Sequence, residues 1–226
     1  MTELSYKPLR YRNRWFAYLD LLGFSDLVSS KSIEEVIPVY SEALSRMRSA
    51  CGPRKEAGTG LLNSWFSDTF IIYTSTDSLE DFARLESAAR IFFQLLITKY
   101  IPVRGCISHG KLYSQAKKNI FIGPALIESH TYGEALNWIG LCLAPSVEKK
   151  LKSELPLEQR PFYRKVSDRS ILRKAPADYL YAYAFNNGAV NGKNHFHSAL
   201  TKMRDDSPSD VRIKYDHTLG FIEKHA

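Results

Sequence analysis

The sequence predicts an α+β fold, a palm-like sandwich in which an antiparallel sheet carries helices on one face. Two segments with helical periodicity, 33–48 and 79–100, alternate with short apolar runs typical of strands. Together they give a β-α-β-β-α-β order with extra strands over residues 1–145, which we expect to form the main domain. Beyond position 145 the character of the chain changes, and we expect residues 146–226 to form a C-terminal helical extension packed on that domain.

The first strand is predicted over 15–22, a continuous apolar run that contains a single carboxylate. Ser32 and Glu35 form a capping-box pattern ahead of a helix over 33–48. The Gly and Pro content of residues 51–60 predicts a loop.

Residues 61–74 read as two strands joined by a turn at Ser67 and Asp68, and the second strand is rich in β-branched and aromatic residues. A long helix with apolar residues on one side follows over 79–100. The elements expected after it are strands over 103–107 and 119–122 and a helix that begins at Pro124.

The last third of the chain gives weaker patterns. Residues 148–178 are charged and contain three prolines, which predicts a peripheral segment of lower order. Helices are expected over 179–185, 194–203 and 211–222.

Length and composition are those of an ordinary globular protein. The chain has 226 residues and a mass of 25.8 kDa, which favours one large domain over two small ones. Hydrophobic residues at 44% and charged residues at 24% exclude a disordered chain, a collagen-like chain and a coiled-coil rod. No apolar run reaches the roughly 18 residues of a membrane helix, so we expect no membrane partner. The N-terminus lacks an apolar signal core, and three widely spaced cysteines suit a reducing compartment, so we expect a cytoplasmic protein.

The chain is basic, with 31 Lys and Arg residues against 24 Asp and Glu residues and a formal net charge of +7. This balance favours anionic partners such as nucleic acid, phosphates or acidic lipid. The charges are spread in small clusters, most of which we expect to be solvated. Because no aromatic-plus-basic reading surface is recognisable, we expect no nucleic acid partner.

Two aspartates stand out because each interrupts an apolar region. Asp20 lies within the run 15–22, and Asp68 lies in the turn of 61–74. A buried carboxylate is unfavourable by several kcal/mol unless a cation or strong donors compensate it. In a β-α-β-β arrangement the end of the first strand lies beside the hairpin turn, so the pair suits two divalent ions and phosphoryl transfer. The alternative is that both carboxylates cap turns or pair with buried arginines.

The turn after Asp20 supports the first interpretation. It is a tight turn that feeds a helix-compatible stretch from Ser25. Amides at a helix N-terminus favour anions, so a triphosphate is expected beside the ions.

Four segments in order resemble the class III nucleotidyl cyclase domain: LDLLGFSDLV, WFSDTFIIY, IPVRGCISHG and NIFIGPALIESHTYGEA. The resemblance covers about residues 14–145. It implies a ferredoxin-like palm sandwich that works as a head-to-tail homodimer with a site shared across the interface. The short chain, the Arg-Gly pair in VRGCIS and the GPALIE segment are closer to the bacterial Pycsar pyrimidine cyclases than to ordinary adenylate or guanylate cyclases.

The resemblance also implies a metal site and a phosphate site. Two divalent cations, Mn²⁺ or Mg²⁺, would be held by Asp20, Asp68 and the backbone carbonyl of Leu21. One ion would help to ionise the ribose 3′-hydroxyl, which attacks the α-phosphate, and the other would share the charge of the leaving pyrophosphate. The amides that would hold the β- and γ-phosphates are those of Leu22, Gly23 and Phe24.

The base-reading positions depart from those of the purine cyclases. Those enzymes read the base with a side chain four residues before the second metal-binding Asp, often Lys or Glu, and that position is Ser64 here. Their second base-reading residue falls on Ile120. A serine leaves a hydroxyl for a smaller ring or a bridging water, which argues against ATP and GTP and is compatible with UTP or CTP.

The Asn and Arg that the family usually carries on the following helix correspond to Ile127 and Thr131. Some other cation must therefore meet the charge that develops in the reaction. Arg104 is the best candidate, because it lies in a buried-looking strand where a guanidinium needs an anion. The alternative is a structural ion pair between Arg104 and Glu128 or Glu134.

These observations lead to one expected function and one alternative. We expect the chain to convert UTP, or less readily CTP, to the 3′,5′-cyclic nucleotide and pyrophosphate, and the preference for UTP rests on the resemblance. In the Pycsar group the cyclic nucleotide is an antiphage signal that opens a separate effector, and we expect the same here. The alternative is a cyclase-like module that has lost catalysis and only senses a nucleotide.

Overall fold

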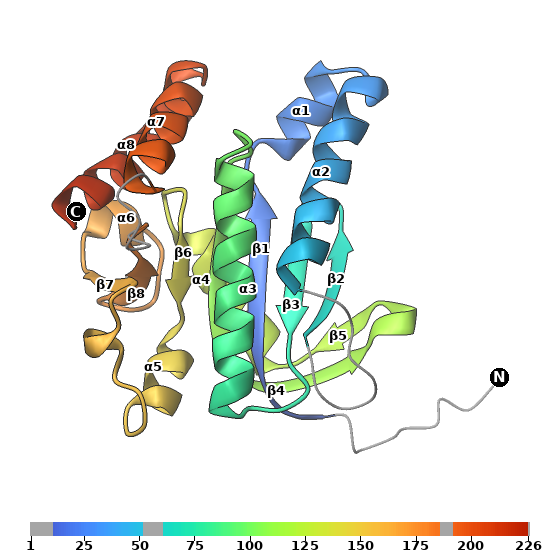
Figure 1. Ribbon diagram of the computed structural model, residues 1–226, viewed down its shortest axis with the longest axis vertical. Helices are drawn as coiled ribbons and strands as arrows, with labels where there is room; N and C mark the ends of the chain where they lie inside the picture. The colour runs from blue at the N-terminus through green and yellow to red at the C-terminus, as the bar shows by residue number, and fades with distance from the viewer. Residues whose placement is uncertain (1–10, 52–60, 186–191, 226) are drawn as a thin grey trace.

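A computed structural model describes residues 11–51, 61–185 and 192–225. In this part of the chain eight strands form one sheet, in the order β2-β3-β1-β4-β6-β8-β7 with β5 paired to β4 (Figure 1). The strands are β1 (Arg12–Leu21), β2 (Leu62–Phe66), β3 (Thr69–Tyr73), β4 (Val103–Gln115), β5 (Ile120–Ile122), β6 (Leu141–Leu143), β7 (Tyr163–Val166) and β8 (Leu180–Tyr183).

Helices cover both faces of this sheet. The α-helices are α1 (Phe24–Ser30), α2 (Ile33–Cys51), α3 (Leu79–Ile97), α4 (Pro124–Ala135), α5 (Pro145–Leu151), α6 (Arg169–Leu172), α7 (Gly192–Asp205) and α8 (Ser209–Lys224). A short 3-10 helix, η2 (Ala116–Lys118), lies between β4 and β5, and another, η3 (Leu157–Gln159), lies between α5 and β7. None of the described helices is long and apolar enough to span a membrane.

Strand β1 lies at the centre, as its continuous apolar run predicts. It pairs antiparallel with β3 on one side and with β4 on the other. Its residues alternate between the two faces, so that Trp15, Leu19 and other odd-numbered residues join the main core with α2 and α3. The even-numbered Phe16 and Tyr18 join a second cluster on the opposite face.

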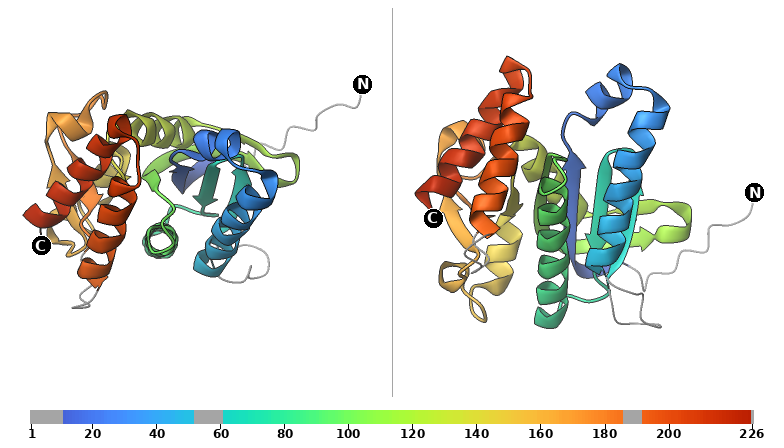
Figure 2. Two further views of the ribbon diagram at one scale, coloured as in Figure 1. Left: turned by 90° about the horizontal axis from the view of Figure 1, so that it is seen from above. Right: turned by 45° about the horizontal axis from the view of Figure 1, so that its top comes forward.

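The two long helices predicted from periodicity are confirmed as α2 and α3. Glu35 accepts a hydrogen bond from the amide of Ser32 (3.2 Å), which is the reach-back half of the predicted capping box. Ser78 caps α3 by accepting from the amide of Asp81 (3.2 Å). Both helices pack on one face of the sheet and bury their apolar sides in the main core (Figure 2).

The expectation of helices on one face only is wrong. Helix α4 lies on the other face, against β1 and β4, as the view from above in Figure 2 shows. Gly123 starts this helix with φ +156°, and a Cβ there would lie 2.2 Å from the carbonyl oxygen of Lys111. Glycine is therefore required where α4 turns back onto the sheet. The sheet is also mixed, because β4 and β6 are parallel.

Residues beyond 145 contribute strands as well as helices. The predicted helix over 179–185 is wrong: β8 lies there, paired with β6 and β7. Residues 148–178, expected to have little order, contain η3, β7 and α6. Helices α7 and α8 confirm the other two C-terminal predictions, whereas the division at residue 145 stays a prediction. Most of the predicted loop 51–60 lies outside the described residues.

Candidate functional site

Asp20 is the next-to-last residue of β1 and is only 9% exposed. It lies directly opposite Arg104 of β4 and opposite Thr69 of β3. Because side chains alternate along the strand, Asp20 shares its face with Tyr18, the face that α4 covers. The predicted carboxylate therefore lies at the end of a central strand and among three elements.

Asp68 lies in the turn between β2 and β3, as the sequence predicts. Its neighbour Ser67 has φ +53°, which closes this tight turn. The carbonyl of Asp68 accepts a hydrogen bond from the amide of Leu21 (3.0 Å), so the hairpin turn is fixed to the end of β1. The fold thus places Asp20, Leu21 and Asp68 together at one end of strands β1, β2 and β3.

Arg104 joins this group through ion pairs. Its Nε and Nη2 atoms both donate to Oδ2 of Asp20 at 3.2 Å, and its Nη2 atom also donates to the carboxylate of Glu134 on α4. The Nη1 atom reaches the backbone carbonyl of Glu134 (3.3 Å). Of the two partners that the sequence left open, Glu134 is the one found. Glu128 instead accepts from the amide of Ser146 (3.2 Å).

Burial raises the pKa of Asp20 to about 6, against the favourable effect of Arg104. The charges of Glu134 and Asp68 raise it further. Burial also raises the pKa of Tyr18, whose hydroxyl donates to Glu134 (3.1 Å). The three carboxylates of Asp20, Asp68 and Glu134 together carry more negative charge than Arg104 alone balances. Such an excess favours a bound cation.

The raised pKa of Asp20 predicts a pH-dependent stability in a metal-free solution. Between pH 3.8 and about 6 the folded protein binds more protons than the unfolded chain, so stability falls as pH rises through this window. The Asp20→Asn variant lacks this loss of stability, so its stability relative to wild type should increase by about 2 kcal/mol from pH 4 to pH 7. Urea unfolding in a chelator, across that range, measures the difference. A difference that stays constant with pH would contradict it.

The donor set fits a hard divalent cation. In the described part of the chain Oδ1 of Asp20 makes no hydrogen bond, and carboxylate and carbonyl oxygens are ligands that Mg²⁺ and Mn²⁺ favour. Among the described residues no three or more His, Cys, Asp and Glu side chains are arranged so that they alone could hold a metal ion. Two carboxylates with the Leu21 carbonyl would thus leave coordination positions for phosphate oxygens and water.

The connection between β1 and α1 carries the three amides that the sequence predicts as phosphate ligands, and their role stays a prediction. Gly23 has φ +71°, a conformation that favours glycine. The amide of Leu22 donates to the carbonyl of Pro102 (2.9 Å), so this amide already has a partner in the structure. The amides of Gly23 and Phe24 make no such backbone bond to another described loop residue.

The predicted base-reading position is engaged in a contact of its own. Ser64, on β2, donates its hydroxyl hydrogen to Oδ1 of Asn119 (2.9 Å), in the connection from β4 to β5. Ile127 and Thr131 are exposed on α4. The structure therefore ties Ser64 to the hairpin that carries Ile120, while its role in reading a base stays a prediction.

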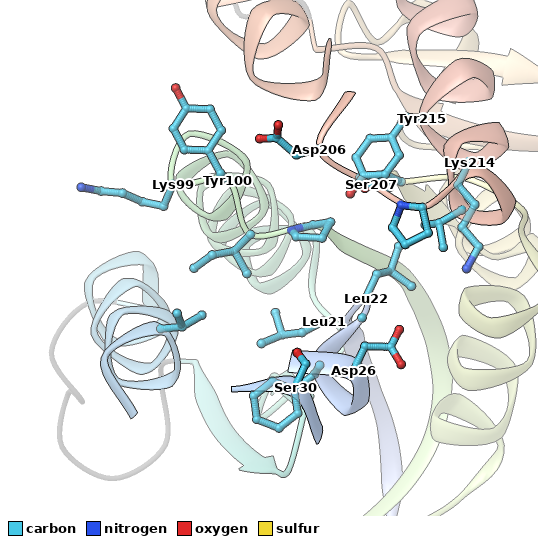
Figure 3. A pocket seen from close by; sticks show the side chains of 18 residues that line it. Leu21, Leu22, Asp26, Ser30, Lys99, Tyr100, Asp206, Ser207, Lys214 and Tyr215 are labelled. Atoms are coloured by element: carbon cyan, nitrogen blue, oxygen red, sulfur yellow. The ribbon is translucent and has the colours of Figure 1, made fainter. Parts of the chain in front are cut away.

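A pocket of about 520 Å³ opens beyond the end of β1 (Figure 3). Leu21 to Phe24 form one wall, and the connection from α3 to β4 forms another. The third wall comes from the start of α8 and includes Lys214. Sequence reasoning missed this wall, because helical periodicity over 211–222 predicts a helix and gives no signal of where it docks.

Comparisons with known proteins bear on the fold. No protein-family model and no curated protein matches this chain. A solved structure of the catalytic core of a rhodopsin-guanylyl cyclase with converted specificity, in complex with ATPαS, superimposes with a TM-score of 0.55 at 10% identity. The match covers 76% of this chain and 95% of that one. The chain therefore has the class III nucleotidyl cyclase fold.

A second solved structure, an EAL/GGDEF domain protein from M.capsulatus, matches with a TM-score of 0.38 at 14% identity. That match covers 54% of this chain and 77% of the other.

Proposed function

We propose that this protein is a nucleotidyl cyclase that converts a pyrimidine ribonucleoside triphosphate to its 3′,5′-cyclic nucleotide and pyrophosphate. One observation carries the proposal: within a cyclase fold, Asp20 and Asp68 lie at the same end of neighbouring strands. The amide of Leu21, next to Asp20, donates a hydrogen bond to the carbonyl of Asp68. The raised pKa of Asp20, a sign of a carboxylate with too little compensating charge, supports a cation-binding role.

In the proposed reaction the 3′-oxygen forms a bond to the α-phosphorus, the bond from that phosphorus to the β-phosphate oxygen breaks, and the hydroxyl proton passes to water. Asp20 and Asp68 would hold divalent cations, which supply charge stabilisation for the phosphates when bound. The guanidinium of Arg104 lies 3.2 Å from the carboxylate of Asp20. From there it would stabilise the negative charge on the reacting phosphate. The amides of Gly23 and Phe24 would bind the terminal phosphates.

The proposed substrate is UTP, with CTP accepted less readily. Support comes from Ser64 and Ile120, which differ from the residues that read a purine in related cyclases. The Ser64 hydroxyl, bonded to Asn119, gives a short polar group in place of a long charged one. The base preference also rests on the sequence resemblance to the Pycsar group.

The proposal includes the setting of the reaction. A head-to-tail homodimer in the cytoplasm would produce a cyclic nucleotide that acts on a separate effector in antiphage defence. Apolar side chains are exposed on β2, β5 and α4, and such side chains support the proposal that a second copy of this chain binds there. They are Phe66, Ile122 and Ile127.

Incubation with each of the four ribonucleoside triphosphates, in Mn²⁺ or Mg²⁺, tests the reaction and the base together. We expect pyrophosphate and a cyclic nucleotide of matching mass from UTP, a smaller yield from CTP, and background levels from ATP and GTP. Turnover of a purine alone would overturn the base assignment and leave the cyclase assignment standing.

A nucleotide sensor without catalysis is the second candidate. It is favoured by the absence of Asn and Arg at positions 127 and 131, and by the ion pairs that already occupy Arg104. Triphosphate binding without pyrophosphate release in any of the four reactions would favour the sensor over the cyclase.

A further inference from the structure

Lys214 of α8 is a cation in the pocket beyond β1 for which the proposed reaction has so far no role. It lines this pocket together with Leu22 and Gly23, although it lies about 190 residues further along the chain. Figure 3 shows its side chain directed toward the side of the pocket where Leu22 and Asp26 lie. The C-terminal extension therefore delivers a positive charge to the predicted phosphate site.

The position of Lys214 is fixed by the next turn of α8. The hydroxyl of Thr218 accepts from the amide of Ile139 (2.9 Å) and contacts the carbonyl of the same residue (3.0 Å) in a fully buried setting. His217 contacts the carbonyl of Asn137 through Nδ1 (2.7 Å). These bonds hold α8 to the segment that leads into β6, so Lys214 is placed by the fold rather than by a free tail.

The ammonium group of Lys214 lacks a counter-ion in the described part of the chain. No carboxylate there lies within 4 Å of it, whereas the other lysine of the pocket, Lys99, lies 3.7 Å from Glu42. The nearby carboxylates Asp20 and Glu134 are already bound by Arg104. Lys214 therefore has no ion pair of its own among the described residues, although the carboxylates of Asp26 and Asp206 also line the pocket.

The surroundings of Lys214 favour an anionic ligand. Burial lowers the pKa of Lys214, and the positive charges of Arg104 and Arg173 lower it further, against the effects of Glu134 and Asp20. The ammonium group is half-buried near two guanidinium groups and near two carboxylates that Arg104 already binds, so a phosphate would add a favourable ionic contact. The pocket volume of about 520 Å³ lies within the range of small-ligand sites, and phosphate groups would satisfy this charge.

We infer that Lys214 binds the terminal phosphates of the substrate, so that the C-terminal extension completes the triphosphate site within the same chain. This inference rests on the proposed function. Lys214 would supply a hydrogen-bond donor at a site where the amide of Leu22 is already bonded to the carbonyl of Pro102. The C-terminal extension would then have a role in substrate binding. When pyrophosphate leaves, it takes with it the oxygens that Lys214 contacts.

Binding of magnesium tripolyphosphate, measured by calorimetry, tests this role without turnover. The Lys214→Met variant should bind this probe about 10-fold or more weakly than wild type, because a charge-assisted hydrogen bond is lost. Lys214→Arg keeps the charge and should recover most of the affinity. Lys224→Met, an exposed position on the same helix outside the pocket, is the matched control and should bind within two-fold of wild type.

The outcomes separate the inference from the function on which it rests. If wild type binds no triphosphate and cyclises none, the proposed function fails and the inference fails with it. If wild type cyclises a triphosphate but Lys214→Met binds tripolyphosphate as tightly as wild type, the inference alone is overturned.

A labelling experiment on wild type covers the case in which the variant does not fold. Acetylation of lysines, followed by mass spectrometry, should show protection of Lys214 by magnesium tripolyphosphate and none at Lys224. Equal labelling of Lys214 with and without the probe would contradict the inference.

Discussion

Asp20→Asn lowers the rate of cyclic nucleotide formation by about 10³-fold or more and leaves the protein folded; this is the largest effect that we expect. The physical reason is that asparagine keeps the shape of the side chain and removes the charge that would hold a divalent cation. Because burial raises the pKa of Asp20, the neutral variant should unfold at the same temperature as wild type or at a higher one at pH 7.5. Mass spectrometry of the products and thermal unfolding measure the two effects.

Asp68→Asn should give a similar loss of activity, because it removes the second carboxylate proposed to hold the cations and keeps the backbone bond between Leu21 and Asp68. Asp178→Asn is a matched control at an exposed position between α6 and β8, and it should retain wild-type activity. Full activity in either Asp20→Asn or Asp68→Asn would show that these carboxylates do not form the metal site.

Arg104→Ala should give the second-largest effect, a loss of about 10²-fold in kcat with less than about three-fold change in KM. In the proposed reaction its guanidinium would meet the charge that develops on the reacting phosphate, and removal of one such donor commonly slows an enzyme by this amount. Steady-state pyrophosphate release with the preferred triphosphate measures both constants. The variant should also be less stable, because Asp20 and Glu134 lose their common cation.

Glu134→Gln distinguishes catalysis from a purely structural ion pair. This change removes the charge, keeps one side-chain acceptor oxygen where Arg104 and Tyr18 now use two, and leaves the contact between Arg104 and Asp20 in place. We expect kcat within about three-fold of wild type. If Glu134→Gln slows the reaction as much as Arg104→Ala does, then Arg104 acts through its pair with Glu134, and its catalytic assignment is wrong.

The sequence was sufficient to predict the elements that carry both aspartates. The run that forms β1 is buried along most of its length, and the β2–β3 hairpin is rich in β-formers, so local patterns and tertiary packing agree. The same holds for α2 and α3, whose apolar sides bury in the main core.

Strand β8 was missed for a physical reason. All four of its residues are buried, so the alternation of polar and apolar residues that marks a strand is absent. A short apolar run of this kind does not distinguish a strand from a buried helix segment. The pairing with β6 and β7, which decides the outcome, depends on residues far away in the sequence.

Two features of the site lay beyond the reach of sequence patterns. The partner of Arg104 was open between Glu128 and Glu134, because the choice depends on the rotation of α4 against the sheet. The docking of α8, which brings Lys214 to the pocket, depends on bonds from Thr218 to a loop 79 residues away. Helical periodicity predicts which side of a helix is apolar, but it does not predict which part of the protein that side packs against.

The central claim is that Asp20 and Asp68 jointly bind divalent cations beside a nucleotide. A crystal structure with Mn²⁺ and 3′-deoxy-UTP, which lacks the attacking hydroxyl, tests it most directly through the anomalous signal of manganese. We predict a manganese peak within about 2.5 Å of carboxylate oxygens of both residues, in contact with the phosphates. A nucleotide bound elsewhere, or manganese that touches neither carboxylate, would contradict the account.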